Sequence, residues 1–495
     1  MRREKTIILR TDKNKIKKED YDTMLMDLFK WLVSYGAAFI VPLFALILGG
    51  LFGAPFKRSF AGALKMGVGF TALGVLIGTI FSALEPAARE LANKFGVNFT
   101  ILDLGWPTQS GIVFAIPWCM AGIALMILCN ALLVTIGLTK TLNVDFNNHW
   151  IFIFYMGATY YLSKNWLLTI AVGIAFWFIS LKMADWVYPY IQPYYNMPTD
   201  GLTVTHAYSI LWAPIGFLLD QLWDRVPVVK DINWNAQDIQ RKFGFFGESI
   251  FIGWVIGFIV GCVAFMTMPP SLEQLGKALS LGFTVALFMY LIPRAAELVV
   301  AGMAPLSEAI RKFLRKRMPG RECYVGLDAA ILVGAPEHVV IGLLTTPIAF
   351  LIAFVLPGNQ VLPMGDVAGL FIFICTFLTN TNRGNIFRGL LNATLLLIPV
   401  SFLIGAQMAP ANVAMATATH FAVTGAKGML FTSLCVGTTP VGFALFKIAM
   451  FIGVTHKLLD LFIGLAILTA FFIVWYLMRN RPSEYVTELL HEGKE

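Results

Sequence analysis

Histidine and carboxylate side chains inside apolar stretches are the residues of this sequence best suited to chemistry. Glu337 and His338 follow Pro336 within a long apolar run, and His206 and His420 each end a short motif rich in threonine. Polar and ionisable groups are costly inside a membrane and usually have a function there. They donate and accept hydrogen bonds, so they suit a neutral ligand that is rich in hydroxyl groups. We therefore treat all four residues as candidate substrate-binding residues.

Each of these candidates also has a purely structural interpretation. His206 and His420 can be hydrogen-bonded between helices, and Glu337 can form an ion pair or lie in an exposed loop. The carboxylate of Glu337 can instead accept hydrogen bonds from two hydroxyl groups, or act as a general base for a hydroxyl that reacts. Glu337 is accordingly the candidate catalytic residue.

Two further polar clusters lie beside breaks in apolar segments. Thr108 and Gln109 follow a proline, and we count both as candidate ligands because backbone N–H groups beyond a helix break can donate to a hydroxyl oxygen. Asn148 and His149 precede the interrupted stretch 149–182. They are good partners for hydroxyl groups, and they are equally good caps for a helix that starts at the membrane surface.

Metal and cofactor motifs are absent from the sequence. It has no phosphate-binding glycine loop, no dinucleotide fingerprint and no HExxH motif. The six cysteines are scattered and lie mostly within apolar runs, where they are typically small buried residues. We therefore predict no metal, no cofactor and no phosphorylated residue on this chain.

The composition indicates whether these side chains belong to a membrane protein or to a soluble one. The chain is 58% hydrophobic and 13% charged, whereas a soluble domain is about 25% charged. A helix that spans a bilayer needs about 20 apolar residues, so the apolar runs predict an all-α polytopic membrane protein with about ten or eleven crossings. The predicted spans are 31–53, 64–84, 110–138, 248–268, 278–302, 329–356, 387–408, 429–452 and 457–478, with 149–182 and 366–378 as half-spans or re-entrant pieces.

Short motifs recur in the same order in the two halves of the chain. The matching pairs are 63–64 with 278–279, 107–109 with 336–338, 138–141 with 378–381, and 203–206 with 417–420. Two repeats in a membrane chain are typical of a transporter whose site lies where the repeats meet. We predict a first repeat at 31–225 and an inverted second repeat at 248–452. The remaining segments are a polar basic N-terminus at 1–30, a cytoplasmic linker at 226–247, a final helix at 453–479 and a polar tail at 480–495.

Basic residues predict which loops face the cytoplasm. The densest basic cluster, at 311–317, is cytoplasmic by the positive-inside rule, and so is Arg241-Lys242. The loop at 89–95 has balanced charge, as an inverted repeat requires of the counterpart of 311–317. Eight Lys and Arg within the first 20 residues favour a cytoplasmic N-terminus. By contrast, if each predicted span crosses the membrane, the sides assigned to the other loops place the N-terminus outside. The net charge of +8 thus reflects topology rather than binding to nucleic acid.

Four motifs carry a resemblance to a known family. They are Leu138–Asp145, Arg241–Ser249, Val355–Asp366 and Asn382–Ile386. In these the chain resembles the galactitol-type IIC component of the bacterial sugar phosphotransferase system, a member of the ascorbate and galactitol superfamily. The resemblance extends over about residues 30–480. Residues 198–203 depart from the family pattern, so the resemblance does not identify the sugar.

The resemblance implies a multi-pass component of the bacterial cytoplasmic membrane that carries a sugar alcohol such as galactitol. Separate IIA and IIB proteins would supply the phosphoryl group, so the phosphoryl donor is on IIB. It also implies a homodimer surrounded by lipid, in which a core domain holds the sugar, a scaffold domain forms the dimer, and the core moves like an elevator. The alternative is an ion-coupled secondary transporter, which needs an ion site and no partner proteins. A purely scaffolding membrane protein has no use for buried Glu and His pairs.

Overall fold

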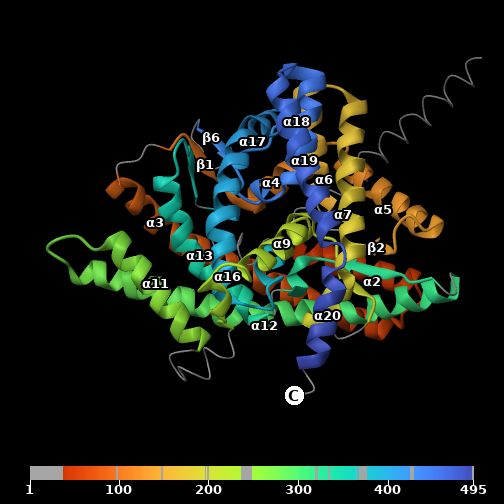
Figure 1. The fold of residues 1–495 in the computed structure, drawn as a ribbon, viewed down its shortest axis with the longest axis horizontal. Helices are drawn as coiled ribbons and strands as arrows, with labels where there is room; N and C mark the ends of the chain where they lie inside the picture. The colour runs from red at the N-terminus through yellow and green to blue at the C-terminus, as the bar shows by residue number, and fades with distance from the viewer. Residues whose placement is uncertain are drawn as a thin grey trace, which may run out of the picture.

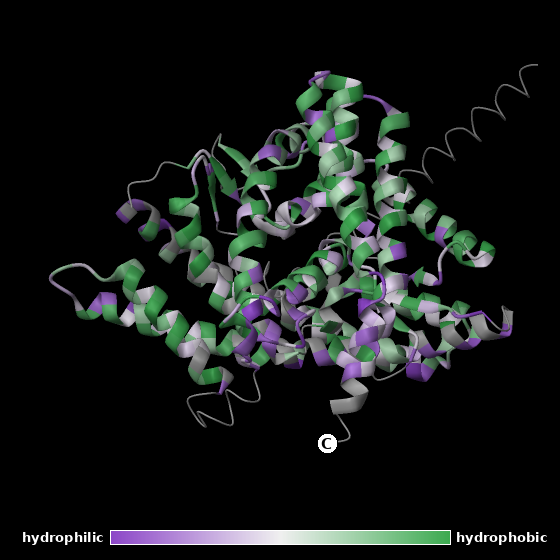
Figure 2. Cartoon of the chain, viewed as in Figure 1, coloured by the Kyte–Doolittle hydropathy of each residue, from purple (hydrophilic) through white to green (hydrophobic). Residues whose placement is uncertain are grey.

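Helices dominate the computed structural model of the chain (Figure 1). The structure describes residues 37–95, 99–145, 149–195, 197, 200–235, 248–317, 321–332, 335–363, 365–366, 376–423 and 429–492. Within these residues, four helical stretches are long and apolar enough to cross a membrane: Phe56–Ile80, Trp166–Tyr194, Ile386–Ala418 and Leu458–Glu488. Figure 2 shows hydrophobic residues along most of the helices. These features agree with the predicted class of an all-α membrane protein.

The helices follow one another in a similar series in each half of the chain. The first half contains α2 (Ala37–Leu51), α3 (Phe56–Phe95), α4 (Gly105–Phe114), α5 (Cys119–Ile136), α6 (His149–Ser163), α7 (Trp166–Tyr194), α8 (Ala207–Ile210), α9 (Ala213–Trp223) and η1 (Val229–Asp231). The second half contains α11 (Ser249–Phe265), α12 (Leu272–Arg317), η3 (Ala329–Leu332), α13 (Pro336–Val355), α15 (Thr376–Asn380), α16 (Ile386–Asn392), η4 (Ala393–Leu397), α17 (Ile398–Ala418), η5 (Val436–Thr438), α18 (Pro440–Met450) and η6 (Phe451–Thr455). Two last helices follow, α19 (Leu458–Met478) and α20 (Arg481–Glu492).

Two small parallel sheets join the halves of the chain. The described strands are β1 (Ile101–Asp103), β2 (Thr141–Asn143), β3 (Leu202–Val204), β4 (Tyr324–Leu327), β5 (Val361–Leu362) and β6 (Leu430–Thr432). β1 lies between β5 and β6, and β4 lies between β2 and β3. Each sheet therefore takes its central strand from one half and both outer strands from the other. The sequence analysis did not include these strands, because two to four residues are too few to show a period of two.

Two buried carboxylates tie the first sheet to the turns that follow its strands. The Asp366 side chain accepts hydrogen bonds from the backbone N–H of Trp106 (2.7 Å) and Cys435 (2.9 Å), and from the Ser433 hydroxyl. The Asp103 side chain accepts the backbone N–H of Asp366 at 2.8 Å. Buried backbone groups need such partners because an unpaired one costs free energy. These bonds connect the end of β1 to the segments after β5 and β6.

The secondary structure corrects part of the predicted motif matching. Residues 63–64 and 278–279 do lie in corresponding long helices, α3 and α12. By contrast, Thr203–His206 leads out of β3, whereas Thr417–His420 ends α17. The pairing of these two motifs is therefore wrong, and in element order the counterpart of β3 is β6. Identical short motifs adopt different structures because tertiary context overrides local preference.

Two predicted spans are divided, and two other predicted boundaries are confirmed. Residues 110–138 are split, because α4 ends at Phe114 and α5 begins at Cys119, just beyond Pro117. Residues 429–452 begin with β6 and η5 before α18 starts. The predicted break at 163–165 is present, where the Asn165 side chain caps α7 by accepting the backbone N–H of Leu167 at 3.0 Å. The predicted last span, 457–478, matches α19.

Helices α2, α3, α11 and α12 pack mainly against one another, and α3, α11 and α12 also contact α13. α11 and α12 run across the lower part of Figure 1, in green. α3 and α12 cross where Gly62 faces Gly302, and a Cβ added to Gly62 would lie 2.5 Å from the Gly302 carbonyl oxygen. Small residues let helix backbones approach closely in a membrane, where van der Waals packing drives association. We call this set of helices the α3–α12 group.

The crossing predicts that Gly62→Ala destabilises the protein. The new methyl group would press on the Gly302 backbone, which overpacks the contact at a cost of about 1–3 kcal/mol. Gly74→Ala is the matched control on the same helix, since a Cβ there meets nothing within 4 Å. It should leave stability equal or raise it by up to about 1 kcal/mol through helix propensity. Thermal unfolding in detergent measures both, and equal midpoints for the two variants would contradict the crossing.

Candidate substrate site

Glu337 and His338 occupy the first turn of α13. Ala335 is extended (φ −73°, ψ 118°), and Pro336 then begins the helix at a position where its missing N–H is no loss. Glu337 is 7% exposed and His338 is fully buried. The proline break predicted from the sequence is thus the N-terminus of a helix, and it turns an acid and a histidine into the protein interior.

Tyrosine and asparagine side chains surround His338. The Tyr195 hydroxyl lies 3.2 Å from His338 Nε2, and the Asn380 side-chain amide donates to the same hydroxyl at 3.4 Å. The Tyr190 hydroxyl donates to the Asn380 backbone carbonyl. Where the Tyr195 hydroxyl donates its proton to Nε2, the neutral imidazole carries its hydrogen on Nδ1. The chain Asn380–Tyr195–His338 therefore orients the imidazole ring.

The segment Asn380–Asn385, here called the asparagine loop, presses against Glu337. Gly384 has φ +75°, and a Cβ there would lie 2.8 Å from the Tyr194 hydroxyl and 3.1 Å from Glu337 Cγ. Both the positive φ and the close approach require glycine at this position. Asn385 ends the loop and caps α16, since its side chain accepts the Arg388 backbone N–H at 3.1 Å.

Several buried polar atoms of His338 and of the asparagine loop have no hydrogen-bond partner among the described residues. They are His338 Nδ1, Asn380 Oδ1, Thr381 Oγ1 and Asn382 Oδ1. Each such atom costs of order 1–3 kcal/mol when it is buried without a partner. A ligand with several hydroxyl groups donates to carbonyl oxygens and accepts from an imidazole N–H, so it can satisfy this mixed set.

A polar cavity of 320 Å³ lies beside the asparagine loop. It is lined by Asp220, Asp224, Lys230, Asn233, Asn235, Asn382, Arg383, Asn385 and Arg388. Arg388 is 8% exposed and forms ion pairs of 2.8 Å with Asp220 and with Asp224. The loop is also bound to the segment after α9, because Asn385 Nδ2 donates to the Ile232 carbonyl at 2.7 Å. The loop thus takes part both in the Glu337 cluster and in a charged cavity.

His206 and His149 lie near the ends of β3 and β2, in the sheet formed by β2, β4 and β3. His206 follows β3 and precedes α8; it is buried, and its Nδ1 has no partner among the described residues. α8 packs against α15, the helix that ends at Asn380. His149 begins α6, is fully buried, and donates from Nδ1 to the Asp145 carbonyl at 2.8 Å. His149 therefore holds the start of a helix, and Asn148 lies outside the described residues.

The remaining predicted residues occupy different settings. Thr108 and Gln109 are in α4, which packs on α5, α6 and α17. The Thr108 hydroxyl donates to the backbone carbonyl of Leu104, the residue just before α4, at 3.1 Å. Gln109 is buried. His420 is exposed at the end of α17 and has φ +53°. The described contacts therefore do not link the Glu337–His338 pair to Thr108, Gln109 or His420.

The sequence reasoning missed the tyrosines of this site. Tyr194 and Tyr195 lie where α7 ends, in an apolar segment that also contains Pro189 and Pro193. Aromatic hydroxyls beside helix-breaking residues were a usable signal, because a buried Tyr hydroxyl usually has a partner. Asn380 and Asn382 belong to a group of asparagines around Arg383. So many amide side chains close together in an apolar chain are also a sequence signal for a polar site.

The apolar helices indicate an integral membrane protein, which has a buried polar cluster at the start of α13. The sequence matches the family described as "PTS system sugar-specific permease component" over residues 31–425, so the chain belongs to this family of sugar permeases of phosphotransferase systems. β6 and helices α18, α19 and α20 lie beyond the matched residues. The match confirms the family resemblance seen in the sequence motifs.

Two relatives from Escherichia coli K12 are similar along most of their length. The chain is 32% identical over 410 residues to a protein named "Putative permease IIC component", which covers 83% of this chain and 91% of the relative. It is 29% identical over 374 residues to the "PTS system galactitol-specific EIIC component", which covers 76% of this chain and 81% of the relative.

The hydrogen-bonded chain at His338 predicts that Tyr195→Phe destabilises the protein. Loss of the hydroxyl leaves the Asn380 amide and His338 Nε2 without their common partner, at a cost of about 1–3 kcal/mol. Tyr476→Phe on α19 is the control, because that side chain is 61% exposed, and its effect should stay within about 0.5 kcal/mol. Thermal unfolding of the purified variants measures the difference. A Tyr195→Phe protein as stable as the control would show that the hydroxyl does not hold these groups.

Proposed function

We propose that the protein carries a galactitol-like sugar alcohol across the bacterial cytoplasmic membrane for phosphorylation by a IIB partner. The observation that carries this proposal is the set of buried polar atoms of His338 and the asparagine loop that lack a partner among the residues that the structure describes. A polyol presents hydroxyl groups that both donate and accept, so one molecule can satisfy several of these atoms at once. The galactitol-specific relative, 29% identical to this chain, supports a sugar alcohol over other sugars.

Glu337 is the residue we assign to the reacting hydroxyl. Its carboxylate lies in the first turn of α13, where the helix dipole favours negative charge. It accepts hydrogen bonds from substrate hydroxyls, and it takes the proton of the hydroxyl that attacks the phosphorus atom on phosphorylated IIB. His338, Asn380 and Asn382 bind the remaining hydroxyls. The phosphoryl group comes from IIA through IIB, so this chain needs no phosphorylated residue of its own.

The position of the polar cavity supports access from the cytoplasm. Asn385 of the asparagine loop donates to the Ile232 carbonyl, and Ile386, just after the loop, donates to the Trp234 carbonyl. Both partners belong to the predicted cytoplasmic linker. Lys230, Arg383 and Arg388 line the same cavity, as expected of a cytoplasmic side under the positive-inside rule. Hydrophilic residues gather at this end of the molecule, around α20 and the segment beside α16 (Figure 2). A IIB protein in the cytoplasm would therefore approach the side of the asparagine loop.

The two sheets support an architecture of two inverted repeats, at residues 31–225 and 248–452. Each sheet combines a central strand of one repeat with two outer strands of the other, which is the exchange that a two-fold axis between repeats would produce. We assign the α3–α12 group to the scaffold that forms a homodimer, and the remaining helices to the core that moves like an elevator. The exposed apolar side chains of α19, such as Phe462 and Ile473, would face lipid.

An ion-coupled transporter finds less support in the structure. Its most suitable carboxylates are Asp103 and Asp366, which are buried beside the first sheet. Both Asp366 oxygens already accept hydrogen bonds from Trp106, Ser433 and Cys435. A carboxylate that is occupied by backbone N–H groups is a structural link rather than an open ion ligand.

Uptake into right-side-out membrane vesicles separates the two mechanisms. Vesicles loaded with phosphorylated IIB should accumulate labelled galactitol as its phosphate, and vesicles with unphosphorylated IIB should not. Accumulation driven by a Na⁺ or H⁺ gradient without IIB would instead identify the ion-coupled mechanism. Other labelled polyols and hexoses, offered in the same assay, would show which sugar is preferred.

Glu337→Gln tests the assigned site directly. The substitution keeps the volume and removes the charge, and hydrogen bonds to charged groups are worth about 1.5–3 kcal/mol. We expect galactitol binding to weaken about 10-fold or more, and phosphorylation in the presence of IIB to fall further because the base is lost. Glu273→Gln is the control, since that side chain is 77% exposed. A correctly inserted Glu337→Gln protein with wild-type binding and transport would place the site elsewhere.

A further inference from the structure

Within the predicted polar tail, residues Arg481–Glu492 form helix α20, which docks on the rest of the protein. Helix α20 packs against α7, and its Tyr485 side chain is fully buried. The Tyr485 ring lies 5.8 Å from the Tyr190 ring and 5.4 Å from the Phe217 ring, between centroids. This helix lies beyond the residues matched by the family. Burial of the Tyr485 ring stabilises the docked position of α20 independently of its surface charges.

Helix α20 reaches the asparagine loop by two routes. Glu488 forms an ion pair with Arg383, a residue of the loop. Tyr485 contacts Tyr190, whose hydroxyl donates to the Asn380 carbonyl at the start of the loop. The Arg383 guanidinium also lies 5.2 Å from the centre of the Tyr485 ring. Helix α20 therefore contacts the loop directly at Arg383 and reaches Asn380 indirectly, through Tyr190 of α7.

The loop backbone needs support of this kind. Arg383 has φ +57° and Gly384 has φ +75°, so two successive residues adopt the left-handed region. A residue with a side chain is unfavourable there and persists only when its surroundings hold it. An exposed ion pair alone contributes little, but here the same arginine also contacts an aromatic ring of a buried residue. The conformation of Arg383 in turn places Gly384 against Glu337.

We propose that α20 is a positioning element that holds the asparagine loop against Glu337 through Glu488 and Tyr485. Its effect on sugar binding rests on the proposed function. Loss of the Arg383–Glu488 pair removes one of the contacts that hold the loop, lets Asn380 and Asn382 shift relative to Glu337, and weakens binding without removing any group that touches the sugar.

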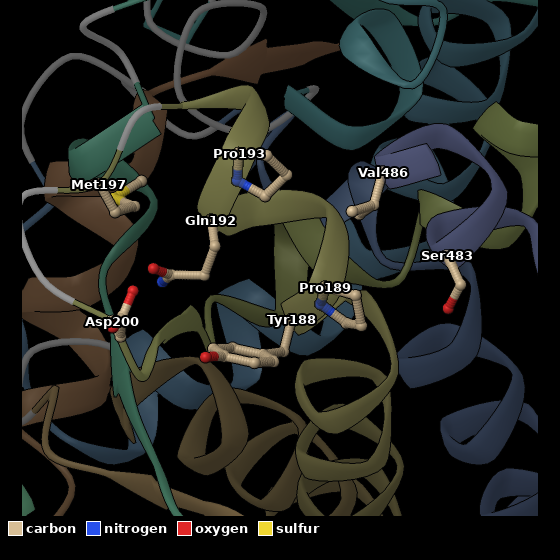
Figure 3. A pocket seen from close by; sticks show the side chains of 8 residues that line it. All are labelled: Tyr188, Pro189, Gln192, Pro193, Met197, Asp200, Ser483 and Val486. Carbon is tan, nitrogen blue, oxygen red and sulfur yellow. The ribbon is translucent and has the colours of Figure 1, made fainter. Parts of the chain in front are cut away.

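The cavity on the other side of α20 provides a matched control. A cavity of 520 Å³ lies between α7 and α20, lined by Tyr188, Pro189, Gln192, Pro193, Met197, Asp200, Ser483 and Val486. Figure 3 shows Ser483 and Val486 across it from Tyr188 and Asp200. A substitution at Ser483 changes α20 on the cavity side and leaves the contact with the loop intact.

A charge swap tests the proposal in the full-length protein. The variants are Arg383→Glu, Glu488→Arg, the double swap, the milder Glu488→Gln and the control Ser483→Arg. Each is measured for galactitol affinity and for amide hydrogen exchange in residues 380–386. We expect each single charge reversal to weaken binding about 5-fold or more and to speed exchange in the loop, and the double swap to recover to within about 2-fold of wild type. Glu488→Gln should show the same changes to a smaller degree, and Ser483→Arg should show neither.

Tyr485 gives a second, uncharged comparison. Tyr485→Phe keeps the ring contact with Tyr190 and should behave as wild type, whereas Tyr485→Ala should speed exchange in the loop. The proposal is overturned if the single charge reversals match wild type in both measurements, or if the double swap is as impaired as the two single changes combined. If the wild-type protein binds no galactitol while loop exchange still responds as expected, the sugar assignment fails and the positioning role stands.

Discussion

Every backbone group that a membrane protein buries must find its hydrogen-bond partner within the protein, and where the helices of this chain break, the two small sheets supply part of that pairing. No water is available in the hydrocarbon region, so irregular backbone is tolerated only where it is enclosed by protein or faces a cavity. β1 has both edges covered by strands of the other half, and β4 is covered in the same way. Asp103 and Asp366 extend this pairing to the N–H groups beyond the strands. The breaks in the helices are thereby stabilised.

One wall of the candidate site forms where α7 and α13 meet. α7, which ends with the tyrosines, leads into β3, and β4 leads through η3 into α13. β3 and β4 are parallel neighbours, so both connections are anchored to one sheet. Tyr195 and His338 meet at the end of α7 and the start of α13. The second wall comes from the asparagine loop, whose close approach at Gly384 is possible only because that residue has no side chain.

Sequence reasoning found the parts of this arrangement that depend on composition and helix breaks. The apolar content predicted a membrane protein, Ser163–Asn165 predicted the break before α7, and Pro336 predicted the turn that carries Glu337 and His338. It could not find the sheets, because a strand of three residues inside an apolar run has no distinctive pattern. It also paired His206 with His420, although one follows a buried strand and the other ends a helix. Contacts across the chain, such as Tyr195 with Asn380, depend on tertiary packing that no local motif reports.

The proline before Glu337 explains why an acid can be kept in the protein interior. Pro336 starts α13, so the carboxylate that follows lies at the positive end of the helix dipole, where negative charge is favoured. The same helix start leaves backbone N–H groups without intrahelical acceptors. A polyol bound there can donate to the carboxylate while its oxygens accept from N–H groups and from the His338 imidazole. These hydrogen bonds do not require a formal charge on the ligand. An acid in this position is therefore compatible with a neutral, hydroxyl-rich substrate.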